Sequence, residues 1–266
     1  MNQINLSSFN ISIDELLNQP TLLFDDEHGH QIYWLGISEE TAFRCNTYLI
    51  LDNQEAIIID PGSRAYFDFV KKRVSEIIPL DYLKGMILCH QDPDVAGSCI
   101  DWLEFDPDLM IISSDRTNVL LPHYGISGYN FYSIGQENNF QYRFSSGNIL
   151  NFIEAPFLHF PGAFTTHDMQ SQYLFSGDIW AALDIDWQLV IDDFNDHQMK
   201  LDLFHLDYMA SNVAARGFAL KIQDLNIEAI LPQHGSIIPK KYIIEAIKYL
   251  EELQCGLDIV YPELSN

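Results

Sequence analysis

Basic residues are scarce in this chain. It has 14 Lys and Arg against 38 Asp and Glu, which gives a formal net charge of −24 at pH 7. Because nucleic acids and anionic membrane surfaces are polyanions, they would repel a chain of this charge. The composition therefore argues against nucleic acid as a partner. A handful of metal-binding carboxylates would explain only a small share of the acids, so most are expected on a solvated surface.

Cysteine is also rare, with four residues at Cys45, Cys89, Cys99 and Cys255. No two of them have CxxC spacing, and 266 residues are enough to fold without disulfide bonds. Cys89 lies in the apolar run MILC. There we expect it to act as a small buried hydrophobic residue.

Neither a targeting segment nor a membrane span is evident. The first residues, MNQINLSSFNISIDELLNQP, have no basic start followed by an apolar run, which a secretory signal requires. No stretch approaches the roughly 20 apolar residues needed to cross a bilayer. We therefore expect a cytoplasmic protein without membrane insertion.

Low-complexity linkers and internal repeats are absent. Hydrophobic residues make up 47% of the chain, which is enough for one sizeable core or at most two small ones. We predict an N-terminal arm over residues 1–20, with a short helix at Ile13–Leu17, and a single domain over residues 21–266.

Apolar runs that stop at turn residues indicate strands, and amphipathic stretches between them indicate helices. The predicted strands are QIYWLGI, NTYLIL, EAIII, GMILC, Met110–Ser113, ILNFIEA, YLFSG and AILP. The predicted helices are Tyr66–Ile78, Val95–Leu103, Asp202–Gln223 and Lys240–Leu253, with a helical turn at Thr117–Leu121 and hairpins or loops over 124–148. Strands and helices do not alternate strictly. This favours an α/β fold with mixed sheets covered by helices over a doubly wound parallel sheet.

Six candidate metal ligands share one context, the polar end of an apolar strand. They are His90, Asp92 and Asp94 in HQDPD, His159 in LHFPG, Asp178 in LFSGD and His234 in LPQHG. Side chains at such ends can converge because the sheet fixes the backbone while the loop leaves the side chain free. Imidazole and carboxylate bind divalent first-row metals, and one carboxylate can give an oxygen to each of two ions.

Each of these motifs alone has a simpler explanation. A lone His at a strand end is more often a hydrogen-bonded structural residue than a ligand. Asp94, before VAGSCI, has the sequence context of a helix N-cap. The ordered set of four motifs, each next to Gly or Pro, is what favours a metal site.

Other candidate residues are interpreted structurally. We take His28 and His30 as solvated turn residues and His123 as structural, although it could line a pocket. No motif surrounds His167, His197 or His205. The acidic stretch DIDWQLVIDDFND, residues 184–196, is expected to be a mobile or solvated loop near the site entrance. Three aromatic residues adjoin the candidate ligands and form either an apolar wall that admits a diatomic gas or ordinary core packing: Phe160, Phe164 and Trp180.

Taken in order, HQDPD, LHFPGAF, LFSGD and LPQHGS resemble the metal motifs of the metallo-β-lactamase superfamily, and more narrowly those of the diiron domain of flavodiiron proteins. The flanking segment FRCNTYLILDNQEAIIIDPGS agrees, and the resemblance covers roughly residues 21–260. It implies a four-layer αβ/βα sandwich with mixed sheets. It also implies a pair of iron ions, with zinc or manganese as alternatives on recombinant expression.

The resemblance also implies which residues bind each ion. It assigns His90, Asp92, His159 and a bridging Asp178 to one ion, and Asp94, Asp178 and His234 to the other. Zinc hydrolases of the superfamily carry HxHxDH, whereas this chain has Asp92 for the second His and Val95 for the fourth ligand. Val95 cannot ligate, so the second ion would keep an open position, as in non-heme iron sites that bind oxygen.

Asp92 is a further departure from the flavodiiron pattern, which normally has Glu at this position. The shorter aspartate changes the reach to the metal by about 1.5 Å, one carbon–carbon bond. This variant resembles the short, flavin-free oxygen-binding diiron proteins linked to chemotaxis. It leaves open whether Asp92 binds directly, as a bridge or through water.

Flavodiiron proteins reduce dioxygen or nitric oxide with FMN from a following flavodoxin-like domain. This chain ends at Asn266 and has no phosphate-binding loop, so we expect neither that domain nor FMN. One hypothesis is therefore a sensor or carrier of dioxygen or nitric oxide that is read by a chemotaxis receptor or signalling enzyme. A second is a reductase fed by an external flavoprotein or rubredoxin. A third is a zinc-dependent hydrolase, against which the missing histidines count. Whether the chain forms a homodimer stays open.

Overall fold

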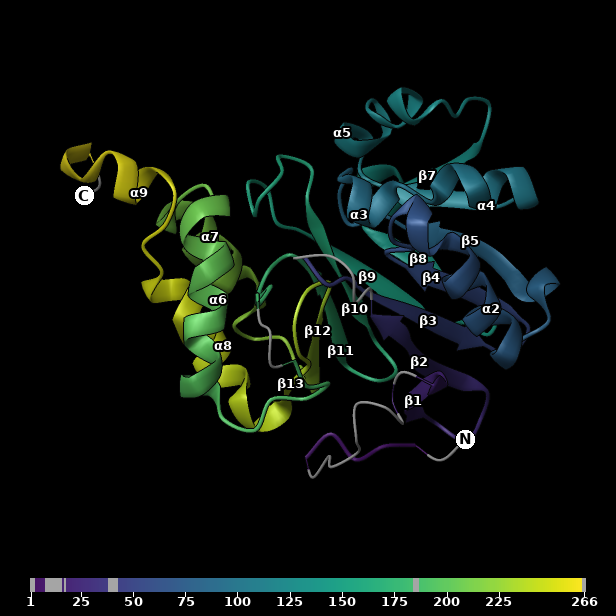
Figure 1. The fold of residues 1–266 in the computed structure, drawn as a ribbon, viewed down its shortest axis with the longest axis horizontal. Helices are drawn as coiled ribbons and strands as arrows, with labels where there is room; N and C mark the ends of the chain where they lie inside the picture. The colour runs from purple at the N-terminus through teal and green to yellow at the C-terminus, as the bar shows by residue number, and fades with distance from the viewer. Residues whose placement is uncertain (1–2, 8–15, 17, 38–42, 184–186, 265–266) are drawn as a thin grey trace.

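Two β-sheets lie face to face in the middle of the molecule, and helices cover the outer face of each (Figure 1). This computed structural model describes residues 3–7, 16, 18–37, 43–183 and 187–264. The layers follow the order helices, seven-stranded sheet, six-stranded sheet, helices. The predicted four-layer sandwich with mixed sheets is confirmed.

The first sheet takes its strands in chain order, and its pairing changes from antiparallel to parallel at β4. Parallel neighbours need a crossover connection, and here the crossovers carry helices. The strands are β1 (Thr21–Asp25), β2 (His30–Ile37), β3 (Asn46–Asp52), β4 (Glu55–Ile59), β5 (Leu83–Ile87), β6 (Met110–Ser113) and β7 (Asn130–Ser133). The helices are α2 (Phe67–Ile77), α3 (Pro93–Ala96), α4 (Cys99–Phe105) and α5 (Asp115–Asn118), with 3₁₀ turns at Arg64–Tyr66, Leu80–Tyr82 and Leu121–Tyr124.

The second sheet has the order β13-β12-β11-β10-β9-β8. Its strands are β8 (Gln141–Arg143), β9 (Ile149–Glu154), β10 (Phe164–Asp168), β11 (Tyr173–Gly177), β12 (Ala229–Pro232) and β13 (Ile238–Pro239). The helices are α6 (Phe194–Tyr208), α7 (Asn212–Ile222), α8 (Ile243–Glu252) and α9 (Leu257–Val260), with 3₁₀ turns at Gln136–Asn138, Lys240–Tyr242 and Pro262–Leu264. Strands β11 and β12 are parallel, and the crossover between them contains α6 and α7.

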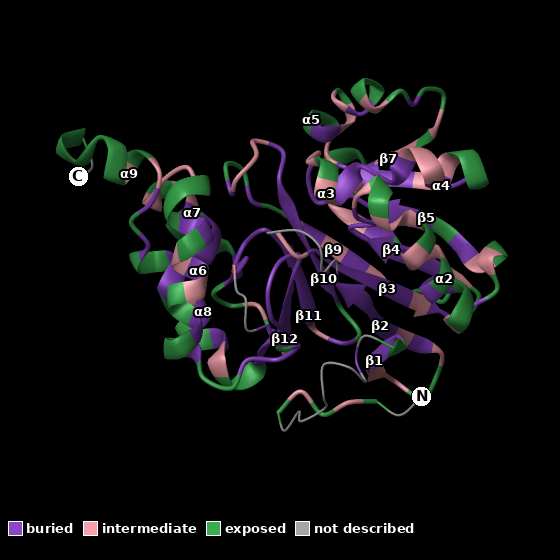
Figure 2. Ribbon diagram, in the orientation of Figure 1, coloured by how far each residue is buried: buried purple, intermediate pink, exposed green. Residues whose placement is uncertain are grey.

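Alternate residues of the central strands pack into different layers of the core. In β2, Trp34 lies between the sheets, whereas Tyr33 and Leu35 lie beneath the helices of the first layer. Successive side chains of a strand point to opposite faces, and both faces are buried here, which explains the continuous apolar runs of the sequence. Figure 2 shows the buried strands and the exposed outer sides of the helices.

The predicted helix Asp202–Gln223 is wrong as one element. The chain forms α6 from Phe194, where the side chain of Asp193 accepts hydrogen bonds from two backbone N–H groups and caps the helix. The helix ends before Met209, whose backbone is extended, and α7 begins after Ser211. The backbone N–H of Ala210 donates to the carbonyl of Phe157, 3.3 Å away, so contact with the loop before His159 replaces a helical hydrogen bond at the break.

The expectation of a solvated loop over residues 184–196 is also wrong for the part that the structure describes. Trp187, Leu189 and Val190 are buried in the core between the sheets. The Trp187 ring stacks on Trp34, with 5.5 Å between centroids, and its indole N–H donates to the carbonyl of Gly235. The burial of these apolar side chains therefore determines the position of the segment, in spite of its acidic neighbours in the sequence.

Smaller differences concern the element ends. The helix predicted at Val95–Leu103 is divided into α3 and α4, and that predicted at Lys240–Leu253 begins as a 3₁₀ turn before α8. The short helix expected at Ile13–Leu17 lies, except for Leu16, outside the described residues.

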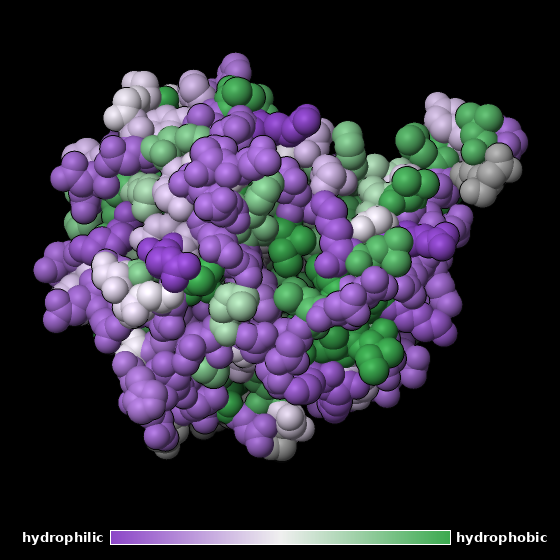
Figure 3. All heavy atoms as spheres, turned by 180° about the vertical axis from the view of Figure 1, so that it is seen from behind, coloured by the Kyte–Doolittle hydropathy of each residue, from purple (hydrophilic) through white to green (hydrophobic). Residues whose placement is uncertain are grey.

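On the face opposite to Figure 1, hydrophobic side chains gather toward the C-terminal helices (Figure 3). Within the described part of the chain, no helix combines the length and the apolar character needed to span a membrane.

Candidate metal centre

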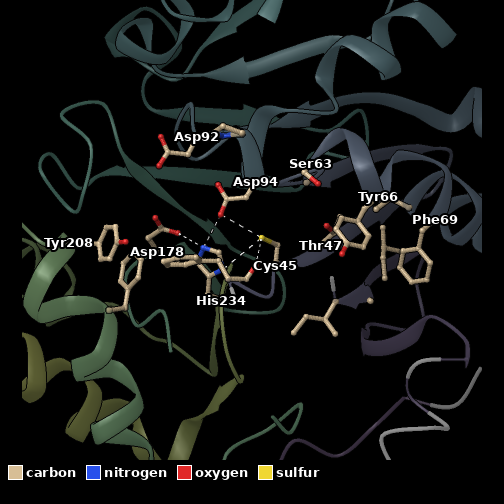
Figure 4. Close-up of a pocket in the computed structure, with 18 of the residues that line it drawn as sticks. Cys45, Thr47, Ser63, Tyr66, Phe69, Asp92, Asp94, Asp178, Tyr208 and His234 are labelled. Carbon is tan, nitrogen blue, oxygen red and sulfur yellow. Dashed lines mark hydrogen bonds and ion pairs between the residues drawn. The ribbon is translucent and has the colours of Figure 1, made fainter. Parts of the chain in front are cut away.

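Loops at one end of the sandwich bring the six predicted ligands together, and Figure 4 labels four of them, Asp92, Asp94, Asp178 and His234. The loop after β5 carries His90, Asp92 and Asp94, and Asp92 is the N-cap residue of α3. His159 lies in the connection from β9 to β10, Asp178 follows β11, and His234 follows β12. Both sheets thus contribute to the cluster. The common position at strand ends is the reason why the sequence pattern could identify these residues.

The first group of donor atoms consists of His90, Asp92, His159 and one oxygen of Asp178. The Asp178 Oδ2 atom lies 3.3 Å from His90 Nε2 and 2.9 Å from His159 Nε2. The Asp92 Oδ2 atom lies 3.3 Å from His159 Nε2 and 3.7 Å from His90 Nε2. Two imidazoles and two carboxylates therefore face one small space, which is a donor set suited to a divalent first-row metal.

The second group shares Asp178 with the first. His234 Nε2 lies 3.2 Å from Asp94 Oδ2 and 3.5 Å from Asp178 Oδ1. Asp178 is only 4% exposed, and its Oδ1 has no hydrogen-bond partner among the described residues. A buried carboxylate oxygen without a donor is costly, and a cation would compensate it. The residues present therefore fit a pair of metal ions bridged by Asp178.

Val95 cannot add a donor to the second group. Its side chain is fully buried and packs in the apolar core beneath the helices of the first layer. In addition, Asp94 does not cap a helix, because the N-cap residue of α3 is Asp92. The second group therefore has fewer imidazole donors than the first.

Mutual attraction dominates the electrostatics of the cluster. Burial raises the pKa of Asp178, but the neighbouring histidines, His90 foremost, outweigh this and hold the pKa below its ordinary range. Burial lowers the pKa of His159, yet hydrogen bonds to Asp178 and Asp92 raise it to about 10. Protons on these rings would occupy the place of a cation. Metal binding therefore requires their release.

Hydrogen bonds outside the cluster orient its members, as is typical of metal ligands. His234 Nδ1 lies 3.2 Å from the carbonyl of Arg44, and His90 Nδ1 lies 3.0 Å from Cys89 Sγ. The carboxylate of Asp60 accepts a hydrogen bond from the Cys89 N–H at 3.0 Å, and burial raises the pKa of Asp60 to about 6. These contacts leave Nε2 of both histidines directed at the acids.

His205 supports the loop that carries Asp178. Burial lowers the pKa of His205 to about 4, so the ring is neutral at pH 7. Its Nδ1 donates to the carbonyl of Leu201 at 2.8 Å, and its Nε2 accepts from the N–H of Trp180 at 3.0 Å. No sequence motif marks His205, because its partner Trp180 lies in another segment of the chain.

A cavity of about 400 Å³ adjoins the cluster. Its wall near the ligands consists of Phe43, Phe204 and Tyr208. The rings of Phe204 and Tyr208 stack with 4.7 Å between centroids, and both meet His159 edge to face. The cavity then extends past Leu35 of β2, Tyr66 of the 3₁₀ turn Arg64–Tyr66, and Phe69 and Val70 of α2.

The three aromatic residues proposed from the sequence do not line this cavity. Phe164 packs between the sheets and Trp180 packs beneath α6–α8. Phe160 is not among the cavity residues either. Core packing, the alternative reading, is correct for Phe164 and Trp180. Sequence adjacency failed because successive residues of a strand or turn point in different directions.

His30 is not a solvated turn residue. It is 1% exposed and lies between two buried acids, with Nδ1 2.8 Å from Asp52 Oδ2 and Nε2 3.1 Å from Asp168 Oδ2. This group, which we call the His30 network, joins the two sheets far along the strands from the metal ligands. His28 and His123 are exposed, and neither lies in the cluster. His167 and His197 are buried outside it.

Comparison with known proteins agrees with this architecture. The sequence profile described as "ODP family beta lactamase" matches residues 43–235. The apo structure of the chemotaxis sensor ODP from T. denticola is 31% identical, with a TM-score of 0.79, over 92% of this chain and 99% of that one. A structure of the peroxy diiron species of chemotaxis sensor ODP is 30% identical, with a TM-score of 0.81, over 92% of this chain and all of that one (100%).

Larger relatives match over part of their length. The nitric oxide reductase of Moorella thermoacetica is 26% identical over 86% of this chain and 61% of that protein. The anaerobic nitric oxide reductase flavorubredoxin of Enterobacter sp. (strain 638) is 26% identical over 83% of this chain and 47% of that protein. The chain spans between 33% and 61% of the length of the first four curated relatives it matches. Since the family profile covers most of the sequence, the chain belongs to the ODP family of β-lactamase-fold proteins.

Proposed function

We propose that this chain is a non-heme diiron protein that binds dioxygen or nitric oxide and acts as a sensor with a separate signalling partner. The observation that carries the proposal is the position of Asp178. Its two oxygens face two different groups of histidine and carboxylate donors. A single bridging carboxylate between two such groups is what a two-iron centre needs.

In this proposal His90, Asp92, His159 and Asp178 hold one iron, and Asp94, Asp178 and His234 hold the other. Ferrous ions held there would supply the electrons that a bound diatomic gas takes up. The chain's own residues provide the environment. The three aspartates offset the charge of the cations, and Val95 contributes no donor, which leaves room for a ligand at the second iron.

The cavity beside the cluster favours a small apolar ligand. Phe204 and Tyr208 form its wall over His159, and Phe43 forms it over His234, at 5.5 Å between centroids. Dioxygen and nitric oxide are nearly apolar and enter such a space without loss of hydrogen bonds to water.

The sensor role rests on the relatives named as chemotaxis sensors, which match over almost their whole length. The second candidate is a reductase fed by an external flavoprotein or rubredoxin, which the nitric oxide reductases among the relatives favour. The zinc-hydrolase alternative finds no support in these relatives. A chemotaxis receptor as partner, a cytoplasmic location and a homodimer stay predictions.

Metal analysis and oxygen titration test the proposal. We expect two irons per chain and one dioxygen bound per ferrous pair, with an absorbance change that is lost on reduction. Repeated oxygen consumption with an artificial reductant would favour the reductase instead. A chain that accepts zinc in both positions but no iron would contradict both forms of the proposal.

A further inference from the structure

We propose that the thiolate of Cys45 is a further protein ligand to the metal ion held by Asp94 and His234. The inference rests on the proposed two-metal centre and adds a donor of a different chemical class to it. Cys45 directly precedes β3, and no metal motif surrounds it in the sequence.

The fold fixes Cys45 beside the second group of donors. Its backbone pairs with His234 in an isolated antiparallel bridge, although the two residues are 189 positions apart. Cys45 Sγ lies 3.6 Å from Asp94 Oδ2 and 3.8 Å from His234 Nδ1. Cys45, Asp94 and His234 each place a donor atom within 4.8 Å of the other two. Figure 4 shows the sulfur directed at these two side chains.

The separation between the Cys45 sulfur and the Asp94 oxygen fits two donors to one ion. A metal–sulfur bond is about 2.3 Å and a metal–oxygen bond about 2.0–2.2 Å, so two donors of one ion lie at most about 4.5 Å apart. The sulfur and the Asp94 oxygen, at 3.6 Å, are within that limit. Cys45 is 8% exposed and lines the cavity, so an ion that enters the cavity can reach it.

The buried oxygen of Asp178 is an independent indication of a cation at this position. The Oδ1 atom belongs to a side chain that is 4% exposed, faces His234 at 3.5 Å and accepts no hydrogen bond from the described residues. With Val95 apolar and buried, Asp94, Asp178 and His234 alone would give the ion few protein donors. A thiolate is a strong donor to first-row metals and would be the fourth protein donor to this ion.

Binding of the metal ion by Cys45 replaces a sulfur–hydrogen bond with a sulfur–metal bond. The thiol S–H bond of Cys45 breaks, a sulfur–metal bond forms, and the proton leaves to solvent through the cavity; no electron is transferred. Among the residues that the structure describes, Cys89 belongs to neither group of candidate donors and does not line the cavity. Cys99 is buried beneath the first helical layer and serves as a matched control.

The test uses Co²⁺ as a spectroscopic probe in the full chain. The wild type and Cys99→Ala should bind two cobalt ions and show an intense near-ultraviolet sulfur-to-cobalt charge-transfer band. In Cys45→Ser this band should disappear, and the dissociation constant of the second ion should rise at least about tenfold, the lower end of what the loss of a supporting partner costs. X-ray absorption of the wild type should show one sulfur neighbour at about 2.3 Å.

Two results would be decisive against the inference. If the wild type binds two cobalt ions but has neither the band nor a sulfur neighbour, Cys45 is not a ligand, and the two-metal centre stands. If the wild type binds fewer than two ions, the two-metal centre itself fails. The wild-type X-ray measurement decides the question even if Cys45→Ser does not fold.

Discussion

At the scale of single residues, the cluster depends on side chains that would repel one another without a cation. Asp92, Asp94 and Asp178 lie within a few ångströms of one another's histidine partners. In the absence of metal, protonated rings can hold these acids together, which the raised pKa of His159 reflects. In its presence, the same Nε2 atoms would become ligands, as proposed above.

Replacement of His159 by alanine should remove one ion and leave the other. His159 belongs only to the first group, whereas His234, Asp94 and Asp178 remain for the second. We expect the metal content to fall from two ions to about one per chain, as measured by elemental analysis after loading with ferrous iron.

The matched control is His123→Ala, which removes an exposed imidazole outside the cluster. It should keep both ions. Equal metal content in the His159 variant and the wild type would refute the ligand assignment.

At the scale of elements, α6 positions one wall of the cavity. It carries Phe204 and Tyr208, and it begins at the Asp193 cap, whose carboxylate accepts from the N–H groups of Asn195 and Asp196 at 2.8 and 3.2 Å. The exposed side of the helix carries apolar residues such as Met199 and Leu203, so burial alone does not define where it starts.

The variant Asp193→Ala should lower the free energy of unfolding by about 1 kcal/mol, because two backbone donors lose their acceptor. Chemical denaturation measures this. The neighbouring exposed residue gives the control, Asp192→Ala, with an expected change within about 0.5 kcal/mol. If both variants behave alike, the cap does not determine the start of α6.

The contrast between strands and helices shows what sequence patterns can predict here. Strand ends followed by HQDPD, SGD and QHG were found because apolar runs and turn residues are local signals. The break between α6 and α7 was missed because it depends on a tertiary hydrogen bond to Phe157. Cys45 and the His30 network were missed for the same reason. Cys45 lies 189 positions from its partner His234, and His30 lies 138 positions from its partner Asp168.

At the scale of the whole molecule, the His30 network connects the two sheets. His30 and Asp52 belong to the first sheet and Asp168 to the second. Burial alone lowers the pKa of His30, but the hydrogen bonds and charges of Asp168 and Asp52 outweigh it and raise the pKa above its ordinary value. Burial raises the pKa of Asp168, and His30 with Ser171 lowers it below its ordinary value.

Replacement of His30 by glutamine should destabilise the protein by about 3–5 kcal/mol, since it leaves buried carboxylates without their partner. A raised histidine pKa contributes stability that is complete below its unfolded value of about 6.5 and is lost as the pH rises through the folded value. A lowered aspartate pKa contributes stability that is complete above about 4 and is lost as the pH falls.

The difference in unfolding free energy between wild type and His30→Gln should therefore be largest between about pH 4 and 6.5 and decrease on either side. Denaturation curves across this range measure it, with the exposed His28→Gln as control. A difference that does not change with pH would show that the ring is neutral in the folded protein.

The candidate metal centre also joins the two sheets. His90, Asp92 and Asp94 follow a strand of the first sheet, whereas Asp178 and His234 follow strands of the second. Ions that bind only the folded chain stabilise it by about 2.7 kcal/mol at a hundredfold excess over the dissociation constant. Removal of metal by a chelator should therefore lower the melting temperature, and addition of ferrous iron should restore it.

This linkage has a consequence in a growing cell. If the centre holds iron as proposed, chains made during iron shortage would spend more time unfolded and would be degraded sooner, because proteolysis follows the population of the open state. The number of intact copies would then follow the iron supply without any transcriptional control.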